Sequence, residues 1–185
     1  MDNFNWKKIK NFNKQQFTNW WNKEKDKFNW HYSNYLCYYC SKHFEIWWNP
    51  DKFDWCYYSD YLCKYCSNYF EIWWDPDKFD WYDLNYLCAY CSQYFETWWN
   101  SDKFNWNYSY HLCRFCSQHI KIWWDPDKFD WSWSNYLCKY CSQHFDIWWN
   151  PDKFSWCDSY SLCRFCQDYK HLWEKDYLIW KLKNA

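Results

Sequence analysis

Apolar residues recur along most of this chain with the spacing of an α-helix. In the unit formed by residues 134–156, the apolar stripe consists of Leu137, Cys141 and Trp148, flanked by Tyr140, His144 and Ile147. These positions lie three, four, seven, ten and eleven residues after Leu137, so they fall on one side of a helix. They do not show the strict alternation that is typical of a strand. The pattern predicts an amphipathic helix in each unit.

The same unit is repeated along the chain. The C-x-x-C motif occurs six times, first after a step of 26 residues and then at steps of 25. The cysteine pairs are Cys37/Cys40, Cys63/Cys66, Cys88/Cys91, Cys113/Cys116, Cys138/Cys141 and Cys163/Cys166. A double Trp follows at Trp47/Trp48, Trp73/Trp74, Trp98/Trp99, Trp123/Trp124 and Trp148/Trp149. A fixed period of this length is typical of stacked repeats, which bury their apolar sides against their neighbours.

Two polar positions indicate where the helices of a unit begin. Ser lies four residues before the first Cys in five of the six units, where its hydroxyl is expected to cap the first N–H groups. An Asn/Asp-Pro-Asp segment follows the double Trp in four units and predicts a second short helix that carries K-F-D-W. The first helix either continues past its second Cys or restarts at Ser142, which leaves two or three helices per unit. We therefore expect an all-α fold, an α-solenoid of about seven 25-residue helical repeats.

The N-terminal end of the array lacks the cysteines but keeps the apolar pattern. Residues 9–21 match the apolar positions of residues 36–48, with Lys10 and Asn13 in place of the two cysteines. Residues 1–30 are therefore predicted to be a divergent, cysteine-free repeat.

The remaining boundaries follow from the repeats. Residues 31–173 hold the six C-x-x-C repeats, residues 174–185 form a C-terminal capping segment, and Asp2–Trp6 echoes D-K-F-N-W ahead of the first repeat. Polar replacements in the last repeat, at Gln167, Lys170 and Glu174, are typical of a cap whose outer face meets water.

The composition excludes several classes of function. The chain of 185 residues contains no Gly, whereas phosphate-binding loops, dinucleotide-binding turns and nucleophile elbows need a residue without a Cβ atom. Its 22 Trp and 20 Tyr supply apolar area that the aliphatic residues do not, so we expect an aromatic core. A net charge of −1 gives no general attraction for nucleic acid or anionic membranes.

The C-x-x-C pairs allow three interpretations. The favoured one is that the thiols are small buried residues packed beside Trp rings. The second is zinc held by pairs from adjacent repeats, because the spacing approaches that of a four-cysteine site. Its ligands would come from Cys37, Cys40, Cys63, Cys66, Cys88, Cys91, Cys113, Cys116, Cys138, Cys141, Cys163 and Cys166. The third is redox or disulfide chemistry, but the first Cys lies at the fourth helical position, beyond the strongest effect of the helix dipole.

Three features weaken the zinc interpretation. Ser or Gln follows each second Cys where zinc knuckles usually have Gly, odd and even repeats do not alternate, and the first repeat has no thiol. Cys56 and Cys157 lie outside the motif and are interpreted as incidental loop residues.

No other residue pattern predicts a catalytic or cofactor site. His43, His119 and His144 share a repeat position with Tyr69, Tyr94 and Tyr169, so that position favours a ring with a polar tip over a metal ligand. The Lys of P-D-K-F recurs once per unit, at Lys27, Lys52, Lys78, Lys103, Lys128 and Lys153. Flanking carboxylates such as Asp51 and Asp54 favour a solvated, salt-bridged ridge over a nucleic-acid track. We assign no catalytic residue and no cofactor-binding residue.

The repeat resembles a known type. The string L-x-x-Y-C-S-x-H-F-D-I-W-W-D-P-D-K-F-N/D-W, which covers nearly the whole chain, is similar to short tandem repeats in proteins of giant DNA viruses of the mimivirus type. Members of that group often have a small residue such as Ala where this chain has its first Cys. The family carries no established activity, so the resemblance implies the repeat architecture and a viral origin.

These observations lead to one expected function and one alternative. We expect a non-enzymatic helical repeat scaffold that binds another protein and neither a membrane nor nucleic acid. The alternative is a zinc-binding structural or nucleic-acid-binding module that uses C-x-x-C pairs from adjacent repeats. Because no apolar run suits a secretory signal or a membrane span, we expect an intracellular protein, in the host cytoplasm or in the virion.

Overall fold

The computed structural model describes residues 4–184, and within that range the chain forms helices, turns and bends without a strand. The predicted all-α repeat fold is confirmed. Asp2 and Asn3, which begin the echo of D-K-F-N-W, lie outside the described residues. The chain divides into two compact units, unit 1 (Met1–Tyr94) and unit 2 (Phe95–Ala185). The sequence-based boundaries at residues 30 and 173 follow the repeats and stay a prediction.

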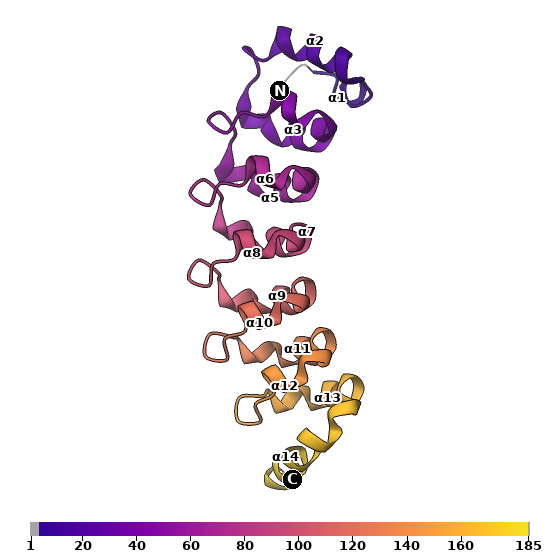
Figure 1. The fold of residues 1–185 in the computed structure, drawn as a ribbon, viewed down its shortest axis with the longest axis vertical. Helices are drawn as coiled ribbons and strands as arrows, with labels where there is room; N and C mark the ends of the chain where they lie inside the picture. The colour runs from indigo at the N-terminus through magenta and orange to yellow at the C-terminus, as the bar shows by residue number, and fades with distance from the viewer. Residues whose placement is uncertain (1–3, 185) are drawn as a thin grey trace. The chain divides into compact units, whose positions relative to one another are not determined.

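Unit 1 is a stack of short helices (Figure 1). Its α-helices are α1 (Trp6–Ile9), α2 (Lys14–Glu24), α3 (Ser33–Cys40), α4 (Phe44–Trp47), α5 (Trp55–Cys66), α6 (Phe70–Trp73) and α7 (Leu84–Tyr90). Its 3₁₀ turns are η1 (Trp30–Tyr32), η2 (Ser41–His43), η3 (Ser67–Tyr69), η4 (Trp81–Asp83) and η5 (Ser92–Tyr94). The C-x-x-C helices α3, α5 and α7 pack against one another in chain order.

Unit 2 repeats this arrangement. Its α-helices are α8 (Phe95–Trp98), α9 (Ser109–Phe115), α10 (Ile120–Trp123), α11 (Ser134–Tyr140), α12 (Phe145–Trp148), α13 (Ser159–Phe165) and α14 (Lys170–Lys183). Its 3₁₀ turns are η6 (Trp106–Tyr108), η7 (Ser117–His119), η8 (Trp131–Trp133), η9 (Ser142–His144), η10 (Trp156–Asp158) and η11 (Gln167–Tyr169). Helix α11 packs between α9 and α13.

The C-x-x-C helix ends at its second Cys, and a 3₁₀ turn begins at the following Ser or Gln. At Cys141 the backbone leaves the helical region, with φ −120° and ψ 16°. The carbonyl freed by this break is satisfied by the first Trp of the next helix, because the Trp148 indole N–H donates to the Cys141 carbonyl at 2.9 Å. The same bond forms in other repeats, from Trp47 to Cys40, Trp73 to Cys66, Trp123 to Cys116 and Trp173 to Cys166.

The second helix predicted at the Asn/Asp-Pro-Asp segment is wrong, because this segment forms a single turn. The Phe53 N–H donates to the Asn49 carbonyl at 3.0 Å and closes the turn. In a continuing helix the Pro50 carbonyl would accept from the Asp54 N–H. Here the Trp55 indole donates to that carbonyl at 2.9 Å, and the Asp54 N–H donates to the Ser33 hydroxyl. In each unit of Figure 1 these turns project on the side opposite the C-x-x-C helices.

The Ser that precedes the motif by four residues begins the helix but does not cap it, so this part of the prediction is also wrong. Helix α11 has no side-chain cap bond at its N-terminus. The Ser134 hydroxyl instead accepts from the Ser155 N–H near the end of the same repeat at 3.1 Å, and it donates to the Trp131 carbonyl. Equivalent bonds run from the Asp54, Asp80 and Asp130 N–H groups to the hydroxyls of Ser33, Ser59 and Ser109. The Ser therefore ties the end of each of these repeats to the start of its first helix.

The core of each unit is a column of identical positions. The Leu and first Cys of α3, α5, α7, α9 and α11 are fully buried, as is the first Trp of each pair, whereas the second Trp is only half-buried. The His/Tyr position stacks on the Phe of the preceding repeat: His43 on Phe17, Tyr69 on Phe44, Tyr94 on Phe70, His119 on Phe95 and Tyr169 on Phe145. This position uses the ring as the sequence suggested.

The two ends differ from the central repeats. Helix α2 continues through both Trp to Glu24, whereas its equivalent α4 ends at Trp47, and in α2 the second Trp, Trp21, is the buried one. At the other end Gln167, Lys170 and Glu174 are exposed. Helix α14 also exposes apolar side chains, with Leu178 52% and Leu182 82% exposed.

Candidate interaction surface

The structure places the C-x-x-C cysteines in the interior. All are buried except Cys163, which is partly exposed, while Cys56 and Cys157 are exposed and lie in α5 and η10, not in loops. Burial raises the pKa of Cys40 to about 12 and raises the pKa of Cys37, Cys63 and Cys113 well above the usual thiol range. These thiols stay protonated at neutral pH, which disfavours nucleophilic and metal-binding chemistry because both need the thiolate.

The zinc alternative finds no site in the part of the chain that the structure describes. Among residues 4–184, no three His, Cys, Asp or Glu side chains are grouped so that they could hold a metal ion. The two cysteines of each motif lie in one helix, or in a helix and its C-cap, and cysteines of adjacent repeats meet in pairs. The residues present therefore do not fit a four-thiolate zinc centre.

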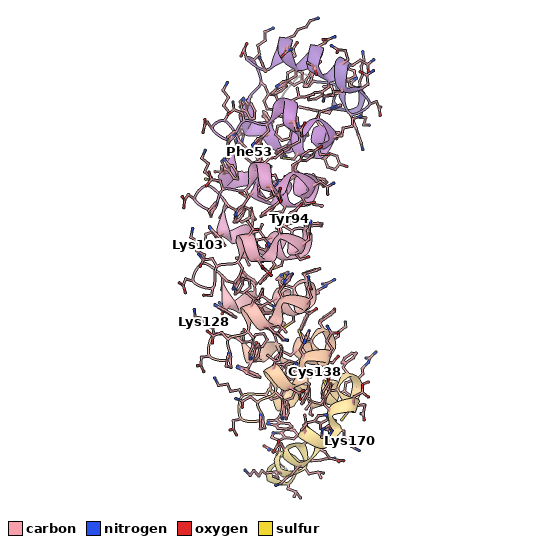
Figure 2. All side chains as sticks on the ribbon, viewed as in Figure 1. Phe53, Tyr94, Lys103, Lys128, Cys138 and Lys170 are labelled. Atoms are coloured by element: carbon pink, nitrogen blue, oxygen red, sulfur yellow. The ribbon has the colours of Figure 1, made fainter. Side chains whose placement is uncertain are left out.

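The turn side of each unit carries the recurrent Lys. The Lys78 ammonium lies 3.0 Å from the Asp51 carboxylate, and Lys128 lies 3.2 Å from Asp102. Lys153 pairs with Asp127 in the same way. Each pair joins one repeat to the preceding one, whereas the sequence suggested neutralisation within a turn. Figure 2 shows Lys103 and Lys128 on the turn side of unit 2 and Cys138 among its helices.

The opposite side of each unit carries an aromatic surface that sequence reasoning missed. Its rings come from two positions, two residues before and two residues after the first Cys, one helical turn apart. We call the following residues the aromatic face: Tyr35, Tyr39, Tyr61, Tyr65, Tyr86 and Tyr90 in unit 1, and His111, Phe115, Tyr136, Tyr140 and Phe165 in unit 2. All of them are partly or largely exposed. The sequence signal for this surface is the recurrence of aromatic residues at both positions. It was missed because the predicted helical pattern placed Tyr140 beside the buried stripe.

The rings of the aromatic face are paired along each of these helices except α13, which has Ser161 at the first of the two positions. The Tyr35 and Tyr39 centroids lie 6.1 Å apart with an interplanar angle of 7°, and those of His111 and Phe115 lie 5.9 Å apart at 16°. The Tyr61–Tyr65, Tyr86–Tyr90 and Tyr136–Tyr140 pairs have centroid distances of 5.6, 6.2 and 5.7 Å. This mutual stacking holds the rings in place, so that the surface is rigid before any partner binds.

In unit 1 the face includes a cavity of about 250 Å³ between α3 and α5. Its lining consists of Asn34, Tyr35, Tyr38, Tyr39, Tyr61 and Tyr65. The Tyr38 and Tyr65 rings meet edge to face with centroids 5.0 Å apart. The Asn34 side-chain oxygen is buried without a hydrogen-bond partner among the described residues. The cavity therefore offers an acceptor surrounded by phenol rings.

In unit 2 the face is basic. Arg114, Lys139 and Arg164 directly follow the first Cys and are exposed. Their charged groups lie over the rings of Phe115, Tyr140 and Phe165, at 4.9, 4.9 and 5.1 Å from the ring centroids. Helices α9, α11 and α13 contain no acidic residue. The face of unit 2 therefore presents one cation per repeat next to an aromatic ring.

Comparison with family models, with curated proteins and with solved structures found no match. In the described part of the chain, no helix combines the length and the apolar character needed to cross a membrane.

Proposed function

We propose that the protein is a non-enzymatic helical repeat scaffold that binds another protein, and that the aromatic face of unit 2 binds an acidic segment of this partner. The observation that carries the proposal is the pairing of Arg114, Lys139 and Arg164 with exposed rings on three consecutive helices. Aromatic residues and Arg are enriched at protein interfaces and dominate their binding energy. A row of cations without acidic neighbours favours carboxylates on the partner.

Single-stranded nucleic acid is the competing ligand, because basic and aromatic side chains also alternate in its binding grooves. Base stacking, however, needs an uncovered ring face. Here Phe115 is stacked by His111 and covered by Arg114, and Tyr140 is covered by Lys139. The edges of these rings and the phenol hydroxyls remain accessible, and both can contact a polypeptide.

The proposal also covers origin and location. The resemblance of the repeat to those of giant DNA viruses supports a viral protein that acts inside the infected cell, in the host cytoplasm or the virion. A scaffold role is consistent with the thiols and imidazoles of the described chain, since neither the raised pKa of the buried Cys nor the stacked His rings suit a nucleophile.

Peptide display tests the proposed binding. A library of random 16-residue peptides is selected on the immobilised full chain, and we expect enrichment of Asp and Glu together with aromatic residues. The triple variant Arg114→Glu, Lys139→Glu, Arg164→Glu should lose this enrichment and weaken selected peptides by at least about tenfold. The matched control is Lys128→Glu with Lys153→Glu on the turn side, which should bind like the parent.

The same variants distinguish the competing ligand. Binding of a labelled 15-residue oligo(dT), lost in the triple variant, would replace the protein-binding proposal with a nucleic-acid-binding one. Peptides that bind the triple variant and the parent equally well would show that the binding surface lies elsewhere. Circular dichroism of each variant checks that the helices are retained.

A further inference from the structure

The cysteines form contacts between repeats that the C-x-x-C motif alone does not suggest. The first Cys of one repeat meets the second Cys of the next repeat, 28 residues further along the chain. The Cys91 sulfur lies 4.0 Å from the Cys63 carbonyl oxygen, the Cys141 sulfur 3.9 Å from that of Cys113, and the Cys166 sulfur 3.8 Å from that of Cys138. In each case the second Cys reaches across the interface to the backbone of the preceding repeat.

The thiols of these residues also interact. Burial and a side-chain hydrogen bond to Cys91 raise the pKa of Cys63, and the corresponding bonds to Cys141 and Cys166 help to raise the pKa of Cys113 and Cys138. Cys37 and Cys66 hold the equivalent repeat positions at the first interface, where burial and the same interaction raise the pKa of Cys37.

The ends of the array follow the same rule. Cys40 is the second Cys of its repeat, but the preceding repeat has Lys10 at the position of the first Cys. Cys163 is the first Cys of the last C-x-x-C repeat, so no later motif supplies a second Cys to meet it. These two cysteines therefore serve as internal controls for any chemistry that depends on pairing between repeats.

We propose that the four thiol pairs Cys37–Cys66, Cys63–Cys91, Cys113–Cys141 and Cys138–Cys166 are sites of oxidative cross-linking between adjacent repeats. In each reaction an external disulfide, such as oxidised glutathione, accepts two electrons. The two S–H bonds of the pair break, one S–S bond forms, and the external disulfide leaves as two thiols. Two neighbouring repeats are then joined covalently across their buried interface.

The position of the pairs determines how the reaction proceeds. Because the thiols are buried and protonated, oxidation of the folded stack is slow and follows local opening of an interface. The bond formed closes a loop of about 28 residues and removes conformational freedom from the unfolded chain. The inference is independent of the proposed partner, since none of these thiols belongs to the aromatic face.

Non-reducing peptide mapping tests the proposal directly. The full chain is refolded in a glutathione redox buffer, remaining thiols are alkylated at low pH, and the product is cut with trypsin. Trypsin cuts between the two cysteines of a motif at Lys64, Arg114, Lys139 and Arg164. In unit 2, the two cysteines of each proposed pair therefore lie on different peptides. We expect residues 104–114 joined to 140–153, and residues 129–139 joined to 165–170.

Two other maps would overturn the proposal. Residues 129–139 joined to 140–153 would show a disulfide within the motif, between Cys138 and Cys141. Full alkylation of all four pairs after refolding in the oxidising buffer would show that the pairs are not cross-linking sites. Cys66→Ser should remove only the bond to Cys37, whereas Cys40→Ser should leave all four bonds in place. Formation of the four bonds should raise Tm on the order of 10 °C, reversed by a reductant.

Discussion

The C-x-x-C helices of unit 1 and unit 2 bury the same residues and expose different charges. In α3, α5 and α7 the exposed positions are mainly Tyr, and the one cation, Lys64, is accompanied by Asp60 on the same helix. In α9, α11 and α13 every helix carries a cation and none carries an acid. Leu, Cys and the first Trp are buried in both units, apart from the partly exposed Cys163.

The difference shows which positions the stack constrains. A residue at the Leu or Cys position is buried in the stack, so its size is constrained by the packing around it. A residue that directly follows the first Cys points to solvent, and there the chain has Tyr38, Lys64 and Ala89 in unit 1 but Arg114, Lys139 and Arg164 in unit 2. We infer that the two units share their stability determinants and that only unit 2 carries the cationic face.

Unit 1 contains a carboxylate cluster with its own pH response. The Asp60 N–H donates to the Asp83 carboxylate at 3.2 Å. Burial, followed by the charges of Asp60 and Asp80, raises the pKa of Asp83 to about 6. Four repeats have an aromatic residue at the position of Asp83, such as Tyr108 and Trp133 in unit 2, but the last repeat has Asp158, whose pKa is also raised by burial. Interfaces with Asp at this position are therefore predicted to be more sensitive to pH than interfaces built from rings.

The largest expected effect concerns the shared core. Trp73→Ala in unit 1 and Trp148→Ala in unit 2 should each lower the free energy of unfolding by about 3 to 5 kcal/mol, because a large buried side chain and the bond to a Cys carbonyl are both lost. Chemical denaturation followed by circular dichroism measures the loss. The exposed Tyr82→Ala is the control and should change little. A Trp variant that unfolds with the parent would contradict the shared core.

The Ser hydroxyl that ties the end of a repeat to its start should give the next largest effect. Ser59→Ala and Ser134→Ala leave the N–H groups of Asp80 and Ser155 without their acceptor, and we expect each to cost about 1 to 3 kcal/mol. Because the bond is the same in both units, the two costs should agree. The exposed Ser132→Ala should cost less. If the Ser variants instead lost helical content only at the N-terminus of the helix that begins with this Ser, the result would support the capping role.

The carboxylate cluster should make the stability of unit 1 depend on pH. Folded Asp83 keeps its proton up to about pH 6, whereas an unfolded Asp loses it near roughly pH 3.9. The folded state thus binds more protons between these values, and the free energy of unfolding falls as pH rises through this window. Asp83→Asn should reduce this slope, of which Asp60 and Asp158 keep a part because their pKa values are also raised by burial. Since the Asp83 side chain is partly exposed, the change should stabilise the protein at pH 7 on the order of 1 kcal/mol.

Denaturant titrations at pH 4, 5, 6 and 7 measure this slope. Glu71→Gln, which removes an exposed carboxylate from the same unit, is the control and should keep the pH dependence of the parent. An Asp83→Asn variant that is destabilised at pH 7 would show that the charged carboxylate is needed for its bond from the Asp60 N–H.

The turn side should give the smallest effect in both units. Lys78→Ala and Lys128→Ala break exposed ion pairs with Asp51 and Asp102, and each should cost about 0.2 to 1 kcal/mol at low salt and less at high salt. Thermal melts at two salt concentrations measure this. A cost as large as that of the Ser variants would show that the ridge of ion pairs holds the repeats together.

Positions within one repeat could be predicted from the sequence, because the local spacing decides them. The helical stripe gave the buried Leu137, Cys141 and Trp148, and the Ser before the motif marked the first residue of each helix. The 25-residue period indicated stacking. Each of these features depends on residues close together in the chain, for which helical periodicity is sufficient.

Contacts between residues far apart in the sequence could not be predicted, because they depend on how the chain turns back within a repeat and on the rotation and rise to the next one. The capping rule assigned the Ser134 hydroxyl to the first N–H groups of its own helix, yet this hydroxyl accepts from the Ser155 N–H, 21 residues later. Longer separations conceal the contact of Cys113 with Cys141, 28 residues apart, and that of Lys128 with Asp102, 26 residues apart. The helix predicted at the Pro turn failed for the same reason, since the Asp54 N–H donates to Ser33 at the start of the repeat.

The Ser-mediated bond also determines how the stack responds to force. Each bond ties the end of a repeat to the start of its helix, 21 residues earlier, so every such repeat has its own closing bond. A pull on a unit places the same tension on all of these bonds, and they break one at a time, with the repeat that has only one neighbour expected to open first. Each rupture releases one 25-residue repeat, which adds roughly 90 Å of extended chain. A stretched molecule should therefore lengthen in steps of equal size, one step for each repeat that opens.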